Sequence, residues 1–189
     1  IFMRKEYEKK LAEYIKENKI KAEQIFFSEL LDNHENVVNT IKEKDINFDD
    51  IVKTVVFVDL GKNLEYGNGV MALVPAESRV DKDKLRKISK SKVKISSPDQ
   101  VLILTDYPAG GVPPFGFKGR FYLDKSLLNN DIVYAGGGSI RTLIKTSIKE
   151  IIKANKAEVV NIVEWSDYLK IYSKFTFTFF IQITPFDIL

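Results

Sequence analysis

The stretch TDYPAGGVPPFGF, residues 105–117, decides the fold, because it concentrates the most flexible and the most rigid residues of the chain. It holds three of the ten glycines and three of the six prolines. The pair Gly110-Gly111 allows the backbone to approach another group closely, and the pair Pro113-Pro114 fixes the backbone that follows. Such a loop is suited to presenting amide donors to a carbonyl oxygen or a phosphate. It is equally suited to a tight crossing between two layers of structure.

Several classes of chemistry are excluded by residues that the chain lacks. With one histidine, His34, and no cysteine, the chain cannot assemble a Cys/His zinc site. A Ser-His-Asp triad would have to use His34, which we expect on the surface at a helix start, and no G-x-S-x-G motif occurs. The loop is not a P-loop either, since Phe117-Lys118 follows Gly116 and both prolines lack an amide donor. We expect neither a metal nor a cofactor.

Composition places the chain among globular proteins. With 189 residues, of which 44% are hydrophobic, it is long enough to bury a core. No segment is long and apolar enough to span a bilayer, and the first residues, IFMRKEYEKK, lack the apolar centre of a signal peptide. The absence of cysteine fits a reducing compartment. We therefore expect a cytoplasmic protein without a membrane partner, whose formal net charge of +3 permits an anionic one.

Helical and strand patterns alternate along the chain, which predicts an α/β protein. Helices are expected at residues 4–18, 35–44, 80–88, 98–104 and 147–155. Strands are expected near residues 25–30 and at 51–60, 70–75, 92–95, 121–124, 131–136, 140–146 and 157–164. Ser97 opens one helix with a capping box that ends at Gln100.

The chain divides into one domain over residues 1–164 and a hydrophobic tail over residues 165–189. Phenylalanine and threonine alternate in the tail, which predicts a strand with one apolar face. Because an exposed strand of this kind would aggregate, we expect it to add to the sheet edge of the domain or to form a homodimer interface.

Two further features are candidates for a site. Lys53 interrupts the apolar strand IVKTVVFVDL (51–60), where a charge is costly unless it faces a polar cavity or a partner; the alternative is an edge lysine whose ammonium reaches water. A second glycine cluster, AGGGSIRT (135–142), follows a predicted strand, and its alternative interpretation is an ordinary hairpin turn.

Taken in order along the chain, five segments resemble the YbaK/prolyl-tRNA synthetase-associated editing domain family. They are IVKTVVF, VMALVPAESRVDKDKLRKI, YPAGGVPPFGF, FYLD and IVYAGGGSIRTLIKTSIKEI, and the resemblance covers about residues 50–154. It implies a mixed, curled β-sheet flanked by helices, with a small pocket for an aminoacyl group. Members of the family hydrolyse mischarged tRNA, commonly tRNA for proline that carries alanine or cysteine.

The resemblance also implies roles for individual residues. Catalytic positions would be the pocket lysine and the first glycine pair, namely Lys53, Gly110 and Gly111. Substrate-binding positions would be Thr54, Pro113, Gly136, Gly137 and Thr142. The chain departs from some members at three positions, where a serine, an aspartate and a histidine of the family are replaced by Ala135, Thr142 and Phe117.

The implied reaction needs none of the missing catalytic groups. An aminoacyl-tRNA ester is already activated, and the neighbouring ribose hydroxyl can assist water once a pocket positions the ester and stabilises its oxyanion. We therefore expect a trans-acting deacylase, and the alternative is a binding module for tRNA or an aminoacyl group without catalysis. The basic segment DKDKLRKISKSKVK (81–94) suits tRNA phosphates, and its alternative is a solvated helix face with Val80, Leu85 and Ile88 turned inward. The tRNA-binding candidates are Lys84, Lys87, Lys90 and Lys92.

Overall fold

The computed structural model describes residues 2–28, 41–42 and 44–164. The predicted helix at 35–44 lies almost entirely outside these residues. His34 and the tail over residues 165–189, with the strand and homodimer interface predicted for it, lie outside them as well.

The described elements follow the predicted alternation of helices and strands. The helices are α1 (Phe2–Glu17), α3 (Lys82–Ser89), α4 (Pro98–Thr105) and α5 (Ile148–Asn155), and short 3-10 turns lie at Phe48–Asp50 and Lys125–Asn129. The strands are β1 (Ala22–Phe26), β2 (Val52–Asp59), β3 (Val70–Pro75), β4 (Val93–Ile95), β5 (Arg120–Asp124), β6 (Ile132–Gly136), β7 (Thr142–Ser147) and β8 (Glu158–Val160). Within the described residues, no helix is both long and apolar enough to cross a bilayer.

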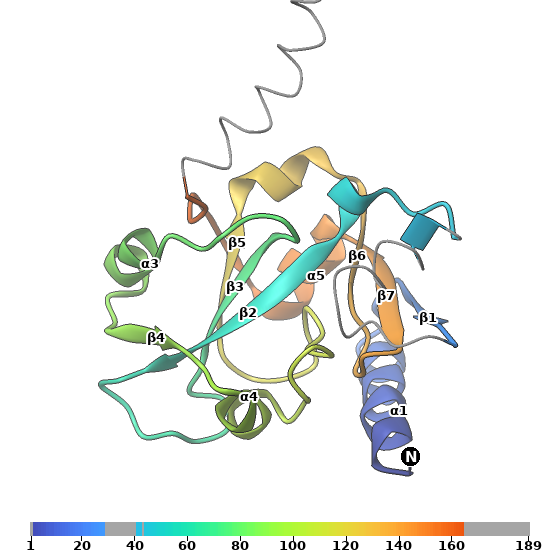
Figure 1. Ribbon diagram of the computed structural model, residues 1–189, viewed down its shortest axis with the longest axis horizontal. Coiled ribbons are helices and arrows are strands. Elements are labelled where there is room, and N and C mark those ends of the chain that lie inside the picture. Colours follow the sequence, from blue (N-terminus) through green and yellow to red (C-terminus); the bar gives the residue numbers. More distant parts are fainter. Residues whose placement is uncertain (1, 29–40, 43, 165–189) are drawn as a thin grey trace, which may run out of the picture.

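The strands form two sheets that lie next to each other (Figure 1). In the larger sheet, of order β4-β2-β3-β5-β8, β2 runs antiparallel to β4 and β3, whereas β5 and β8 join in parallel. The smaller sheet, β1-β7-β6, is antiparallel throughout. A parallel bridge between Ile51 and Tyr134 connects the two. The expected mixed α/β fold is confirmed, and the expected curled sheet is divided into two hydrogen-bonded parts that meet at this bridge.

Local sequence explains most element boundaries. Ser97 caps α4 with the predicted capping box, in which the N–H of Gln100 bonds to the Ser97 hydroxyl and the Gln100 side chain accepts from the Ser97 N–H. The first strand was expected near 25–30, but β1 occupies Ala22–Phe26. Its sequence, AEQIF, has little strand propensity, so pairing with β7 along its whole length fixes its position.

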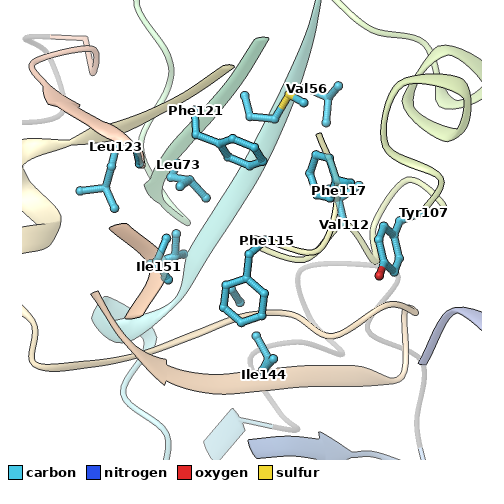
Figure 2. Packing of buried hydrophobic residues seen from close by; sticks show 14 of the residues in the cluster. Val56, Leu73, Tyr107, Val112, Phe115, Phe117, Phe121, Leu123, Ile144 and Ile151 are labelled. Atoms are coloured by element: carbon cyan, nitrogen blue, oxygen red, sulfur yellow. The ribbon is translucent and has the colours of Figure 1, made fainter. Parts of the chain in front are cut away.

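The main hydrophobic core lies between the sheets and the helices α1, α4 and α5. Figure 2 shows Val112, Phe115 and Phe117 of the loop among side chains from β2, β5 and β7. A second cluster covers the other face of the larger sheet, where Leu85 of α3 is fully buried. The proline- and glycine-rich loop is therefore part of the main core, which explains why its shape has to be fixed.

A buried carboxylate fixes the C-terminal end of the described chain. Asp124, at the end of β5, is fully buried, and its Oδ2 accepts the N–H groups of Ile162 at 2.7 Å and Val163 at 3.1 Å. Its Oδ1 accepts from the N–H and the hydroxyl of Ser126. Four donors therefore compensate the removal of this carboxylate from water.

Candidate functional site: two packed glycine turns

The first glycine turn runs from Pro108 to Gly111 and leads into the core. The Gly111 N–H donates to the Pro108 carbonyl at 3.0 Å, and Gly110 lies at the third position of this turn with φ +83°. A positive φ at this position is the reason for a glycine. Gly110 is exposed, whereas every residue from Gly111 to Phe117 is buried.

Two side chains from other elements hold the buried part of this loop. The Thr54 hydroxyl, on β2, donates to the Pro113 carbonyl at 3.3 Å. The amide of Asn155, at the end of α5, donates to the Pro114 carbonyl at 2.5 Å. The carbonyls of both prolines are thus satisfied by side-chain donors inside the protein. Thr54 and Pro113, predicted to share a site, are in direct contact.

The second glycine turn packs directly against the first. A Cβ at Gly111 would lie 2.7 Å from Cα and N of Ser139, and one at Gly136 would lie 2.3 Å from the Val112 carbonyl oxygen. The Gly138 N–H donates to the Gly111 carbonyl at 2.9 Å. Glycine is required at 111 and 136 because two backbones meet there. These contacts match the interpretation of the loop as a tight crossing, and the crossing brings the two predicted site segments together.

The second turn is closed by its own hydrogen bonds and by α1. The Gly137 N–H donates to the Thr142 carbonyl at 2.8 Å. Thr142 is 1% exposed, and its hydroxyl donates to Oε1 of Glu8 at 2.8 Å. The Ser139 hydroxyl donates to the same oxygen at 2.5 Å. Thr142 therefore supports the turn from inside.

Alternation along β2 directs the Lys53 and Thr54 side chains to opposite faces. Val52 and Val56 belong to the main core, and Phe57 belongs to the second cluster. Since successive side chains of a strand alternate, Thr54 faces the main core and the first glycine turn, whereas Lys53 faces the other side.

The Lys53 ammonium is held at the end of β3. Its Nζ donates to the Ala76 carbonyl at 2.7 Å, and the side chain is half-buried. The Lys53 ammonium therefore has a hydrogen-bond acceptor, which a charge within an apolar strand needs. The bridge between Ile51 and Tyr134 is parallel, so both chains continue from it in the same direction. Lys53 lies two residues after Ile51, and Gly136 lies two residues after Tyr134. The start of β2 thus runs beside the strand that leads into the second glycine turn.

Comparison with known proteins assigns this arrangement to a family. The model of the aminoacyl-tRNA editing domain matches residues 33–154. The chain belongs to the aminoacyl-tRNA editing domain family. Both glycine turns and the Lys53-Thr54 pair lie inside the matched region of this editing domain, and the resemblance of the five sequence segments is confirmed.

Individual proteins are similar to this chain in sequence or in fold. The "Uncharacterized protein YwhH" of Bacillus subtilis (strain 168) is 29% identical in an alignment of 146 residues that covers 73% of this chain and 90% of that protein. The crystal structure of "hypothetical protein APE2540" superposes with a TM-score of 0.70 at 25% identity, covering 82% of this chain and 99% of that one. A "putative trans-editing enzyme for prolyl tRNA synthetase" superposes with a TM-score of 0.72 at 23% identity, covering 84% and 97%.

The basic segment of the editing domain is a surface helix and the turn after it. Lys87, Lys90 and Lys92 are exposed. Lys84 is half-buried, because its Nζ donates to the Val163 carbonyl at 2.7 Å and lies 3.7 Å from an Asp81 carboxylate oxygen. Figure 1 shows α3 and β4 on one side of the molecule, and α1 with the smaller sheet on the other. The segment is therefore separate from the glycine turns.

A partly buried ion pair anchors the end of the basic helix. The Arg120 guanidinium donates to Oδ2 of Asp59 at 2.8 Å and to the Ser89 carbonyl at 3.0 Å. Burial alone would raise the pKa of Asp59, which is 5% exposed, but hydrogen bonds from the Gly61 N–H, Ser91 and Arg120 outweigh it and lower the pKa. The inward positions predicted for this helix are confirmed, with Leu85 fully buried and Val80 and Ile88 packed beside it.

Tyr107 directly precedes the first turn and is fully buried. Burial raises the pKa of Tyr107 well above its ordinary value, so this phenol is neutral and is no general base at physiological pH. Among residues 2–28, 41–42 and 44–164, no three histidine, aspartate or glutamate side chains gather so that they could hold a metal ion.

Sequence reasoning missed Glu8 and Ser139. Glu8 precedes Leu11 by three residues, so both lie on one side of α1. The only indication in the sequence was a carboxylate next to the apolar side of a helix. Its role could not be predicted, because its partner Ser139 is more than one hundred residues away in the chain.

Proposed function

We propose that this editing domain is a free-standing cytoplasmic deacylase that hydrolyses the ester bond of mischarged aminoacyl-tRNA. Its substrate would be tRNA for proline that carries a small amino acid such as alanine or cysteine. The observation that carries the proposal is the direct packing of the two glycine turns, both inside the matched family region, with Thr54 holding the first. The choice of a small amino acid rests on the resemblance to the editing family, because the two backbones themselves fill the space at their crossing.

The proposed chemistry relies on position and on the substrate itself. Water attacks the ester carbonyl carbon, the ester C–O bond breaks, and the ribose oxygen leaves with a proton. The neighbouring ribose hydroxyl assists the attacking water, so no histidine, cysteine or metal is required. Lys53 lies on the face of β2 opposite the first glycine turn, so it would supply a fixed positive charge for the terminal phosphate and not for the ester carbonyl, with its ammonium held by the Ala76 carbonyl. It would act without exchanging a proton.

Exposure distinguishes the residues that could touch the ester from those that support them. Ala109 and Gly110 are exposed, so a substrate can reach this part of the first turn, where Gly110 has no side chain to block its backbone. The N–H groups of Gly111, Gly137 and Gly138 already donate inside the protein. These three residues would therefore maintain the pocket shape, and Gly110 would contact the substrate.

Contact with the rest of the tRNA would come from the exposed lysines of the basic segment. Lys87, Lys90 and Lys92 can reach phosphates, and non-specific contacts of this type give binding that weakens as salt rises. Lys84 would contribute less, since its ammonium is shared between Val163 and Asp81.

A deacylation panel tests the proposed reaction. Purified protein is incubated with tRNA for proline that carries alanine, cysteine or proline. A further sample contains tRNA for alanine that carries alanine, its correct amino acid. We expect release of alanine or cysteine from the proline tRNA and little loss of the correctly matched pairs. If no charged tRNA of the panel loses its amino acid faster than it does in buffer, the proposed deacylase activity is refuted.

A second candidate is a non-catalytic module that binds tRNA or an aminoacyl group. It is favoured by the internal use of the Gly111, Gly137 and Gly138 N–H groups, which leaves few donors for an oxyanion. Binding of charged tRNA without turnover in the same panel would select it.

A further inference from the structure

The N-terminal helix makes polar contacts with the second glycine turn, although α1 and β1 precede the family-matched residues 33–154. A Cβ at Gly138 would lie 3.1 Å from the Tyr7 carbonyl oxygen, so the turn touches the backbone of α1. The Gln24 amide, on β1, donates to the carbonyls of both Glu8 at 3.0 Å and Gly137 at 3.2 Å. Two elements outside the matched region thus contact a turn inside it.

The centre of this contact is the carboxylate of Glu8. Its Oε1 accepts the hydroxyls of Ser139 and Thr142, which are 3% and 1% exposed and whose oxygens lie 3.0 Å apart. The Ser139 oxygen in turn accepts the Arg141 N–H at 3.1 Å. Each hydroxyl has one proton to donate, and the carboxylate takes both. The two ends of the turn are therefore tied to one oxygen of α1.

The restraint extends to the first glycine turn. Ser139 is the residue whose backbone lies against Gly111, and the neighbouring Gly138 N–H bonds to the Gly111 carbonyl. If Ser139 moves, the surface on which Gly111 packs moves with it. Glu8 is thus linked through Ser139 to the exposed Gly110, which precedes Gly111.

We propose that Glu8 is a positioning residue of the editing site, which holds both glycine turns in their reactive arrangement through Ser139 and Thr142. The inference rests on the proposed deacylase for its kinetic part only. A residue that touches no substrate but holds the pocket should affect turnover more than apparent affinity, because a small displacement of reacting groups lowers the rate steeply.

Three variants of the full chain test the proposal. Glu8→Ala removes both acceptor bonds, and Glu8→Gln keeps an acceptor oxygen in place. Glu13→Gln is the matched control on the same helix, because the Glu13 side chain is 62% exposed and lies 3.8 Å from Lys9. Hydrogen exchange of the Gly137 and Gly138 amides is measured by NMR in each variant.

Exchange decides the structural part independently of any activity. We expect both amides to exchange about tenfold faster or more in Glu8→Ala, with Glu8→Gln intermediate and Glu13→Gln unchanged. A uniform increase across the main core would mean general loss of stability and would overturn a specific positioning role. Unchanged exchange in Glu8→Ala would overturn it as well.

Kinetics decide the functional part. Against the substrate that the deacylation panel selects, kcat of Glu8→Ala should fall about tenfold or more while KM changes less than about threefold, and Glu8→Gln should recover part of the rate. Wild-type kcat in Glu8→Ala would refute positioning. If wild-type protein hydrolyses nothing in the panel, the deacylase proposal fails, and the exchange result still decides whether Glu8 holds the turns.

Discussion

Replacing Gly111 by alanine tests whether the two glycine turns depend on close backbone contact. The new methyl group would lie 2.7 Å from Cα and N of Ser139 and 2.9 Å from the Gly138 carbonyl carbon, all of them backbone atoms. Ordinary contact begins at 3.4 Å, so the turns must separate by 3.4 − 2.7 = 0.7 Å. No side chain can rotate to make this room.

The cost has two parts. Overpacking of a buried site costs about 1–3 kcal/mol. The same 0.7 Å stretches the hydrogen bond from the Gly138 N–H to the Gly111 carbonyl from 2.9 Å to about 3.6 Å, which is outside hydrogen-bonding range. Losing it adds about 1 kcal/mol. We expect the free energy of unfolding to fall by about 2–4 kcal/mol, which lowers Tm by about 4–16 °C.

Urea unfolding followed by circular dichroism measures this loss of stability. The m-value of the variant should equal that of wild type, which shows that both proteins unfold in the same transition. The matched control is Gly61→Ala, because a methyl group there meets only an Asp59 carboxylate oxygen at an ordinary 3.4 Å. The control should stay within about 0.5 kcal/mol of wild type. Equal stability of Gly111→Ala and Gly61→Ala would refute the close-contact explanation of the glycine at 111.

Three further predictions concern charged residues. The pKa of Asp59 is lowered in the folded protein, so its contribution to stability should be present above pH ~4 and be lost as pH falls further; Asp59→Asn should flatten that part of a Tm–pH profile. Lys53→Ala should reduce the deacylation rate about tenfold or more and cost about 1 kcal/mol of stability, since the Ala76 carbonyl loses its donor; unchanged turnover on the panel substrate would exclude Lys53 from the site. Charge reversal at Lys87 and Lys90 should weaken tRNA binding and reduce its salt dependence in a filter-binding titration, and an unchanged salt slope would assign both to a solvated helix face.

Elements with strong local signals could be predicted from the sequence. β3 begins and ends where its apolar run predicts, at Val70 and Pro75, and the capping box between Ser97 and Gln100 forms as its spacing indicates. The position of β1 could not be predicted, because its polar residues become a strand only through pairing with β7.

The candidate site was predictable as a set of segments and not as a geometry. Sequence order pointed to Lys53 and to the two glycine clusters, but it could not show that Gly111 meets Ser139 or that a carboxylate of α1 ties the second turn. These contacts join residues that are far apart in the chain, so no local sequence pattern predicts them. The alternation along β2 was visible in the sequence, yet which face held the first turn depended on how the loop folds.

The four hydrogen bonds to the Asp124 carboxylate set a practical limit on how the protein can be shortened. Two of its four donors come from Ile162 and Val163, beyond residue 154, where the family match ends. A fragment cut at 154 from homology would lose β8 and half of the donors of the Asp124 carboxylate, at about 1.5–3 kcal/mol for each lost hydrogen bond to this charged group. A fragment cut after residue 164 keeps both. For expression, labelling or crystallisation of the editing domain, the hydrogen bonds of Asp124 are therefore a better guide to the cutting point than the end of sequence similarity.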